Sequence, residues 1–337
     1  MNLAEEKIVF HQTRDIGEVL STTFRVIREN PKTLLMGTLY FTLPFFVAGS
    51  LAMISAFDET LLASEDPGGM SASAALVSVL LLLAGFMLSG LGMVMQITFV
   101  NETVKYLAVN PGLPRPGVRE IWRTVKTQFW KNILNALVWL ILVSMASVML
   151  NVLVLIFIPA IMIGGESVAA GAIAAIIFIF VLMLAMSYLY SISVPIFFIS
   201  VYEDINIFNA IGRALSLIHS GKDNFWGAIF VNLIALLITF ILSFNFMVPL
   251  GIIFGVIAYN SGNPEAFLED EGLVLFAKIG TAAYSLFRAF VLIIPFIAVA
   301  IKYFDWVERV DGKGLSDRIR SIGHNRDFDP GMYEETY

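Results

Sequence analysis

Six apolar runs follow one another along the chain, and each is long enough to cross a bilayer as a helix. They cover about Thr33–Phe57, Ser73 onward, Ile133–Ile163, Val168–Val201, Gly227–Tyr259 and Leu273–Tyr303. About 20 apolar residues suffice for a helix to cross a hydrocarbon core roughly 30 Å thick. Hydrophobic residues make up 58% of the 337 residues and charged residues 14%, whereas soluble domains carry about 25% charged residues. The sequence therefore predicts an all-α polytopic membrane bundle of six transmembrane helices.

The composition also excludes several classes of site. The chain has no cysteine, which excludes disulfides, thiolate metal sites and a cysteine nucleophile. Its histidines, His11, His219 and His324, all lie outside the apolar runs. The sequence contains no phosphate-binding glycine loop, zinc-binding histidine helix or GxSxG elbow. We therefore expect no enzyme activity, no catalytic residue, no cofactor and no metal.

One polar connection has the pattern of a helix that lies on a membrane surface. Residues 202–226, between the fourth and fifth runs, have the sequence YEDINIFNAIGRALSLIHSGKDNFW. Apolar residues recur in this segment at three- and four-residue intervals, at Ile205, Phe208, Ile211, Leu215 and Ile218. Gly221 is expected to end the helix as a C-cap, followed by Phe225 and Trp226 at the membrane interface. The pattern predicts an amphipathic helix that leads into the next span.

Two further segments share this pattern. Asp15 and Glu18 predict a capping box at the start of a helix, and Pro31 is expected to end that helix before the first span. Its apolar face comprises Ile16, Val19, Leu20, Phe24 and Ile27. A basic surface helix is predicted from Val118 to about Phe129, ahead of the third span. Each pair of spans is thus preceded by one amphipathic helix.

This order divides a single membrane domain, residues 1–320, into three similar units. The units cover about residues 15–108, 116–202 and 204–304, and each combines a surface helix with a transmembrane hairpin. Because each unit contains an even number of spans, the units would be parallel repeats. Simple constraints on hairpins would also produce this pattern. Residues 321–337 are expected to form a flexible cytoplasmic tail.

The distribution of charge predicts the orientation. All of the 21 basic residues except Lys278 and Arg288 fall on one side of the predicted spans, which leaves 19 there. The loops on the opposite side carry nine acids, and the net charge of the chain is −6. By the positive-inside rule, both termini and all three surface helices are cytoplasmic.

Arg288 is a candidate functional residue because it stands inside the sixth span. It lies 14 residues before Lys302, or roughly 20 Å from the cytoplasmic edge at about 1.5 Å per residue. A charge at that depth usually faces protein, water or a lipid headgroup. The possible partners are Asn151, Asn245, Tyr284 or a lipid phosphate. The alternative is that Arg288 extends to the outer surface and has no function there.

The basic residues of the surface helices are candidates for binding membrane lipids. Arg25, Arg123 and Arg213 occur in the three predicted surface helices, and a nearby basic residue contributes roughly 1 kcal/mol to binding of anionic headgroups. The alternative is that these charges only set the topology. In the second span, Gly85, Ser89, Gly90 and Gly92 are expected to permit close contact with another helix.

Three segments of the chain resemble a known family. They are FRVIRENPKTLLMG before the first span, RALSLIHSGKDNFWG before the fifth and KYFDWVERVDGKGL after the sixth. They are similar to the membrane domain of glycerophosphoryl diester phosphodiesterases and its stand-alone bacterial relatives. The closing signature corresponds here to Tyr303, Phe304, Asp305, Arg309, Gly312 and Leu315. The resemblance covers nearly the whole chain, but no catalytic phosphodiesterase barrel is attached, so that activity is not expected.

The resemblance implies a bacterial inner-membrane protein that works with other membrane proteins. The first hypothesis is therefore a non-enzymatic integral membrane scaffold or accessory subunit, which binds membrane lipids and other integral membrane proteins and no nucleic acid. The alternative is a transport or lipid-handling protein with a cavity near Arg288. A third, weaker hypothesis is an enzyme with an unrecognised site.

Overall fold

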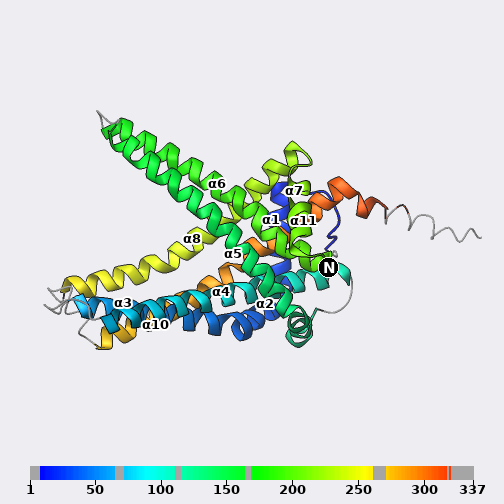
Figure 1. The fold of residues 1–337 in the computed structure, drawn as a ribbon. Coiled ribbons are helices and arrows are strands. Elements are labelled where there is room, and N and C mark those ends of the chain that lie inside the picture. The colour runs from blue at the N-terminus through cyan, green and yellow to red at the C-terminus, as the bar shows by residue number, and fades with distance from the viewer. Residues whose placement is uncertain are drawn as a thin grey trace, which may run out of the picture.

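The computed structural model describes residues 8–64, 72–110, 115–163, 168–260, 271–316 and 319, and this part of the chain consists of helices joined by short connections (Figure 1). The helices are α1 (Ile16–Glu29), α2 (Pro31–Gly37), the π-helix η1 (Thr38–Thr42), α3 (Leu43–Ser64), α4 (Ala72–Val109), α5 (Val118–Ile163), α6 (Val168–Tyr202), α7 (Ile207–Ile218), α8 (Lys222–Asn260), α10 (Glu271–Val291) and α11 (Ile293–Asp311). The predicted all-α class is confirmed.

Five stretches of helix in the described part are long and apolar enough to cross a membrane. They are Pro31–Ala56, Ala72–Val109, Phe180–Tyr202, Lys222–Ile253 and Val274–Asp311. These helices indicate a membrane protein. The run expected as the third span falls in α5, where most side chains beyond residue 141 lie outside the described residues. The predicted tail, residues 321–337, also lies outside them.

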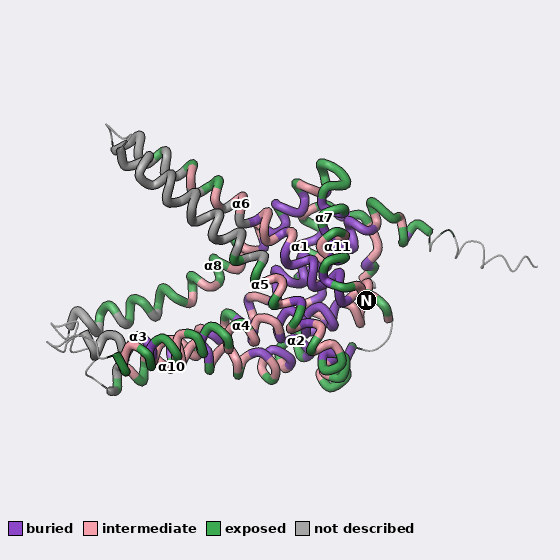
Figure 2. The backbone as a smooth tube through the Cα atoms, in the orientation of Figure 1, coloured by how far each residue is buried: buried purple, intermediate pink, exposed green. Residues whose placement is uncertain are grey.

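The helices form a compact hub from which two arms extend (Figure 1). The hub, as we define it, consists of α1, α7, α11 and the adjoining ends of α4, α5, α6 and α8. The hairpin arm consists of the outer parts of α5 and α6, and the bundle arm of α3 and α10 with the outer parts of α4 and α8. Buried residues concentrate in the hub, whereas the described residues of the arms are mostly intermediate or exposed (Figure 2).

The ends and kinks of the helices follow from particular residues. The Asp15 side chain accepts from the Glu18 N–H, and the Glu18 side chain accepts from the Asp15 N–H, so the predicted capping box is confirmed. α1 ends at Glu29 with Asn30 as its C-cap, and Pro31 opens α2, so the predicted end of the helix before Pro31 is confirmed. Proline has no N–H to donate to the carbonyl four residues earlier. Pro44 accordingly follows the π-helix η1, and Pro295 follows the break between α10 and α11.

The second surface helix is not a separate element. α5 runs without a break from Val118 to Ile163, so the residues predicted for that helix form the first turns of a 46-residue helix. The physical reason is the absence of a helix breaker, because no glycine or proline occurs between residues 118 and 158. The other two short helices end at such residues, α1 before Pro31 and α7 shortly before Gly221.

The structure corrects one prediction about α7, the position of its C-cap. The residues that α7 buries are Ile207, Ala210, Ala214, Leu217 and Ile218. Phe208, on the predicted apolar face, is 70% exposed. The two small alanines allow α7 to approach its neighbours closely, and the large Phe208 side chain is turned outward. The C-cap is His219, whose N–H donates to the Leu215 carbonyl at 3.0 Å, and Gly221 instead precedes α8.

Candidate functional site

Helix α11 is the centre of the hub. All 15 of its residues from Ile293 to Val307 are buried. A helix that is apolar on all sides is normally enclosed by other helices, yet this one also carries Lys302, Tyr303 and Asp305. Tyr303 and Asp305 belong to the closing signature identified in the sequence, so their contacts show what these two signature residues do in this fold.

Asp305 joins the N-terminal segment to α11. Its side chain is fully buried. One oxygen, Oδ2, accepts from Lys302 Nζ at 2.5 Å, and Oδ1 accepts from Arg309 Nε at 2.8 Å. Oδ1 also accepts from the backbone N–H of Arg14 at 2.8 Å. A buried carboxylate needs such donors to offset the loss of hydration, and here they come from two separate segments of the chain.

Arg14 orders the residues before α1. Its guanidinium donates to the carbonyls of Val9 and Phe10, the latter at 2.7 Å. Burial lowers the pKa of Arg14, while the nearby Asp305 carboxylate opposes that shift. Arg309 Nη2 also donates to the Arg14 carbonyl at 3.0 Å. The N-terminal segment is therefore held against α11 through both backbone groups of one residue.

A second network joins α11 to α6 and α7. The Tyr303 hydroxyl donates to Glu203 Oε1 at 2.6 Å, and Arg213 Nε approaches the same oxygen at 3.3 Å. Arg213 Nη2 also forms an ion pair with Asp311. Burial opposes the charge of Arg213, but its bonds to Asp311 and Glu203 outweigh burial and raise its pKa. The candidate Arg213 thus connects helices, and the sequence pattern gave no sign of its partners.

Basic residues from two helices also gather at the C-terminal end of α6. Lys105 Nζ donates to the Val201 carbonyl at 2.6 Å. Lys131 Nζ donates to the Ser200 carbonyl at 3.3 Å and forms an ion pair with Asp204 Oδ1 at 2.8 Å. The hydrogen bond from Lys131 and the charge of Lys131 lower the pKa of Asp204. Cations are favourable here because the last carbonyls of a helix carry partial negative charge.

The remaining sequence candidates are dispersed over the structure. Arg25 forms an ion pair at 2.7 Å with Glu29 of its own helix. Arg123 is exposed on the first part of α5, and the Asn245 amide donates to the Ile241 carbonyl of its own helix at 2.7 Å. The Asn151 side chain lies outside the described residues. The structure does not bring the candidate residues together into one site.

Arg288 lies where the bundle arm meets the hub. It is exposed in the last turn of α10, just before the break at Leu292, and continuous burial begins at Ile293. Among the residues that the structure describes, no acid forms an ion pair with Arg288 and neither Asn245 nor Tyr284 hydrogen-bonds to it. The arrangement provides a guanidinium for an external anion.

Comparison of the chain with protein-family models, with curated proteins and with solved structures finds no match.

Proposed function

We propose that the chain is a non-enzymatic scaffold or accessory subunit that holds another integral membrane protein between its arms. The observation that carries this proposal is the exposed Arg288 guanidinium at the foot of the arms. A cation at membrane depth is costly unless it has an anionic or polar partner. A carboxylate on a transmembrane helix of the partner would satisfy Arg288, and the apolar sides of the arms would pack against that helix.

The exposed apolar residues of the arms support this proposal. Ile141 on α5, Ile177 on α6 and Phe240 on α8 are each at least 58% exposed. The arms diverge from the hub, so the hairpin arm is not covered by the bundle arm along its length (Figure 1). Lipid covers such surfaces in a bilayer, but a second protein would bury them with complementary shape.

A second candidate function, lipid handling, is favoured by the same residue. A lipid phosphate drawn to Arg288 would also neutralise the charge, since arginine binds phosphate with paired hydrogen bonds. In that case the surface around Arg288 would bind a headgroup, and the apolar sides of the arms would contact its acyl chains.

The proposal includes the topology. It places six crossings in a bacterial inner membrane, with α5 supplying the sixth, and the hub and both termini on the cytoplasmic side. The excess of basic residues near the hub supports this orientation by the positive-inside rule. The three repeated units and the relation to the phosphodiesterase membrane domain remain part of the same proposal.

Site-specific photocrosslinking in cells tests the function. A photoreactive amino acid at Phe240 or Ile141 is expected to capture a discrete membrane protein. Arg288→Leu is expected to reduce this product about tenfold or more, because an ion pair shielded from water would be lost, and Arg288→Lys is expected to retain part of it. The matched control is Arg119→Leu, which removes an exposed arginine near the start of α5.

The products distinguish the two candidates. Lipid adducts that depend on Arg288, without a protein product, would support lipid handling and contradict the scaffold. Products that are the same in the wild type and in Arg288→Leu would contradict both roles for this residue.

A further inference from the structure

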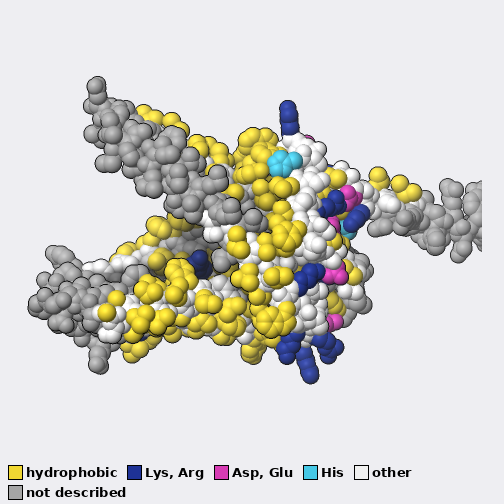
Figure 3. All heavy atoms as spheres, in the orientation of Figure 1, with side chains coloured by type: hydrophobic (Ala, Val, Ile, Leu, Met, Phe, Trp, Pro, Cys, Tyr) yellow, Lys and Arg dark blue, Asp and Glu magenta, His cyan; other side chains and the backbone are white. Residues whose placement is uncertain are grey.

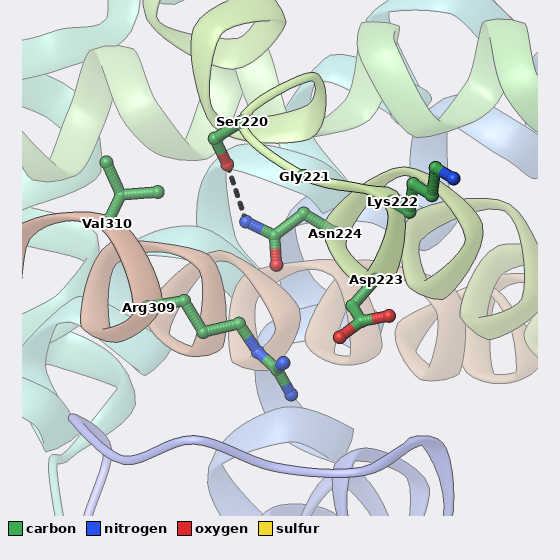
Figure 4. Close-up of a pocket in the computed structure, with 7 residues that line it drawn as sticks. All are labelled: Ser220, Gly221, Lys222, Asp223, Asn224, Arg309 and Val310. Atoms are coloured by element: carbon green, nitrogen blue, oxygen red, sulfur yellow. Dashed lines mark hydrogen bonds between the residues drawn. The ribbon is translucent and has the colours of Figure 1, made fainter.

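An open cavity of about 420 Å³ lies where the connection between α7 and α8 faces the end of α11 (Figure 4). Residues 220–224 line one side, and Arg309 and Val310 line the other. The segment belongs to the SGKDNFW sequence, whose polar residues take no part in the contacts proposed for Arg288. The cavity is of a size that accommodates a small ligand or a headgroup.

Asn224 lines this cavity, and its side-chain oxygen is a buried hydrogen-bond acceptor that no group in the described part of the chain uses. Its side chain is only 4% exposed. The amide nitrogen donates to Ser220 Oγ at 2.7 Å and to the Leu217 carbonyl at 3.3 Å, which fixes the orientation of the amide. The oxygen Oδ1 has no hydrogen-bond partner in the described part of the chain. In Figure 4 it points away from Ser220, toward the side where Asp223 and Arg309 lie. A buried acceptor in this state favours a ligand that donates a hydrogen bond.

The same cavity also has features that bind an anion. It contains the first residues of α8, a helix of 39 residues, whose first N–H groups have no partner within the helix. Arg309 contributes its guanidinium, of which Nε bonds to Asp305 and Nη2 to the Arg14 carbonyl. Within the described residues Nη1 makes no hydrogen bond, and it remains available for an anion.

The charges in the cavity are therefore of both signs. Asp223 and the Asn224 oxygen can accept hydrogen bonds from a ligand, whereas Arg309 and the first N–H groups of α8 can donate them. A ligand with a single charge would bind either the acceptors or the donors of the cavity, and the other groups would stay without a partner. A ligand that carries both an anionic group and a cationic donor, separated by a short linker, would satisfy all of these groups.

We propose that this cavity binds a zwitterionic phosphate ester that carries a primary ammonium group. The phosphate would lie against Arg309 and the first turn of α8, and the ammonium would donate to Asn224 Oδ1 and to the Asp223 carboxylate. Phe225 and Trp226 follow directly, and Trp226 is 49% exposed, as is typical of aromatic residues at headgroup level. The ester is thus either a phospholipid headgroup or a soluble compound with the same chemistry.

The test compares two zwitterionic lipids, one with a primary ammonium group that donates hydrogen bonds and one with a trimethylated nitrogen that donates none. The full-length protein is placed in nanodiscs with equal amounts of phosphatidylethanolamine and phosphatidylcholine, and the lipids that stay bound are counted by native mass spectrometry. Both lipids carry phosphate, but the choline nitrogen has no N–H. The wild type is expected to retain phosphatidylethanolamine about tenfold more often, the effect of one satisfied buried acceptor.

Three variants localise the preference. Asn224→Leu keeps the branched shape of the side chain and removes the acceptor along with the amide donor, so the preference is expected to disappear. Asp223→Asn changes an exposed residue and is expected to weaken the preference for phosphatidylethanolamine. This variant replaces Asn224→Leu in the test if Asn224→Leu does not fold. Asn209→Leu changes an exposed asparagine of α7 outside the cavity and is expected to leave the preference unchanged. Equal retention of both lipids by the wild type, or a preference that survives both cavity variants, would overturn the proposal.

A second measurement identifies the source of the ester. Phosphoethanolamine and phosphocholine are added to the protein in lipid-free detergent micelles, and the unfolding temperature is recorded. An increase with phosphoethanolamine alone assigns the ligand to soluble esters. If neither compound raises the unfolding temperature and the protein still prefers phosphatidylethanolamine in nanodiscs, the ligand is a phospholipid of the bilayer. Neither result depends on Arg288, so this site is tested separately from the scaffold proposal.

Discussion

Asp305 shows how one buried charge can hold distant parts of a chain together. Its carboxylate accepts from Lys302 and Arg309 in α11 and from the backbone of Arg14 near the other end of the sequence. Lys302 is itself only 3% exposed. The main energetic consequence concerns Lys302. If Asp305 is lost, the Lys302 ammonium group stays buried without a counter-ion, and this costs far more free energy than the intact ion pair contributes to stability.

Asp305→Asn is therefore expected to destabilise the hub by about 3–5 kcal/mol, the usual effect of breaking a buried ion pair from one side. The measurement is the unfolding temperature of the purified protein in detergent. The double variant with Lys302→Met removes both charges and is expected to recover a large part of the loss. An unfolding temperature of Asp305→Asn equal to that of the wild type would mean that the network does not stabilise the hub.

At the scale of elements, the contact between α3 and α4 depends on glycines that permit close approach of the backbones. A Cβ atom on Gly85 would lie 2.6 Å from Met53 Cγ and 2.8 Å from the Gly49 carbonyl oxygen. A Cβ on Gly49 would lie 2.4 Å from Ser89 Oγ. The small residues predicted to allow close helix contact do so at Gly85, Ser89 and Gly92, where a Cβ on Gly92 would lie 3.2 Å from Phe45 Cβ. Gly90 was wrongly included, because a Cβ there would meet nothing within 4 Å.

Gly85→Val is expected to push α3 and α4 apart and to destabilise the bundle arm by about 1–3 kcal/mol, as overpacking does elsewhere. Gly90→Ala is the matched control on the same helix. It adds a methyl group in open space and favours helix by about 0.5–1 kcal/mol, so its unfolding temperature should equal or exceed that of the wild type. The interpretation fails if both variants shift the unfolding temperature by the same amount.

At the scale of the whole molecule, buried residues concentrate in the hub (Figure 2), and most of the charged side chains visible in Figure 3 lie there too, whereas the described parts of the arms expose apolar side chains. This division fits a protein whose hub is held by networks such as that of Asp305 and whose arms lie in lipid. The orientation that we propose from the positive-inside rule would place the hub on the cytoplasmic side and the tips of the arms on the other.

The absence of cysteine makes this orientation straightforward to test, since a single introduced cysteine is the only thiol in the chain. A cysteine at Ala72, at the outer end of α4, is expected to react with a membrane-impermeant maleimide in intact cells. A cysteine at Lys313, beyond the end of α11, is expected to react only after the membrane is opened. The opposite pattern of labelling would reverse the proposed topology.

Much of the fold was predictable because local patterns determine it. Long apolar runs, the capping box at Asp15 and the break at Pro31 depend on residues that are close in the chain. The prediction of a separate second surface helix failed because the same sequence pattern fits more than one local structure. The basic segment at the start of α5 has helical periodicity whether it is a separate helix or a continuation, and no local residue breaks it.

The sequence by itself determined the helical class, the apolar spans and several helix ends, since these depend on hydropathy and on neighbours within about one turn. Only the tertiary structure decided what the charged residues do. It pairs Arg213 with Glu203 and Asp311, surrounds Asp305 with donors, and leaves an Asn224 oxygen facing a cavity. The physical reason is that ion pairs and buried acceptors are set by distances between segments far apart in the chain, and periodicity carries no information about those distances.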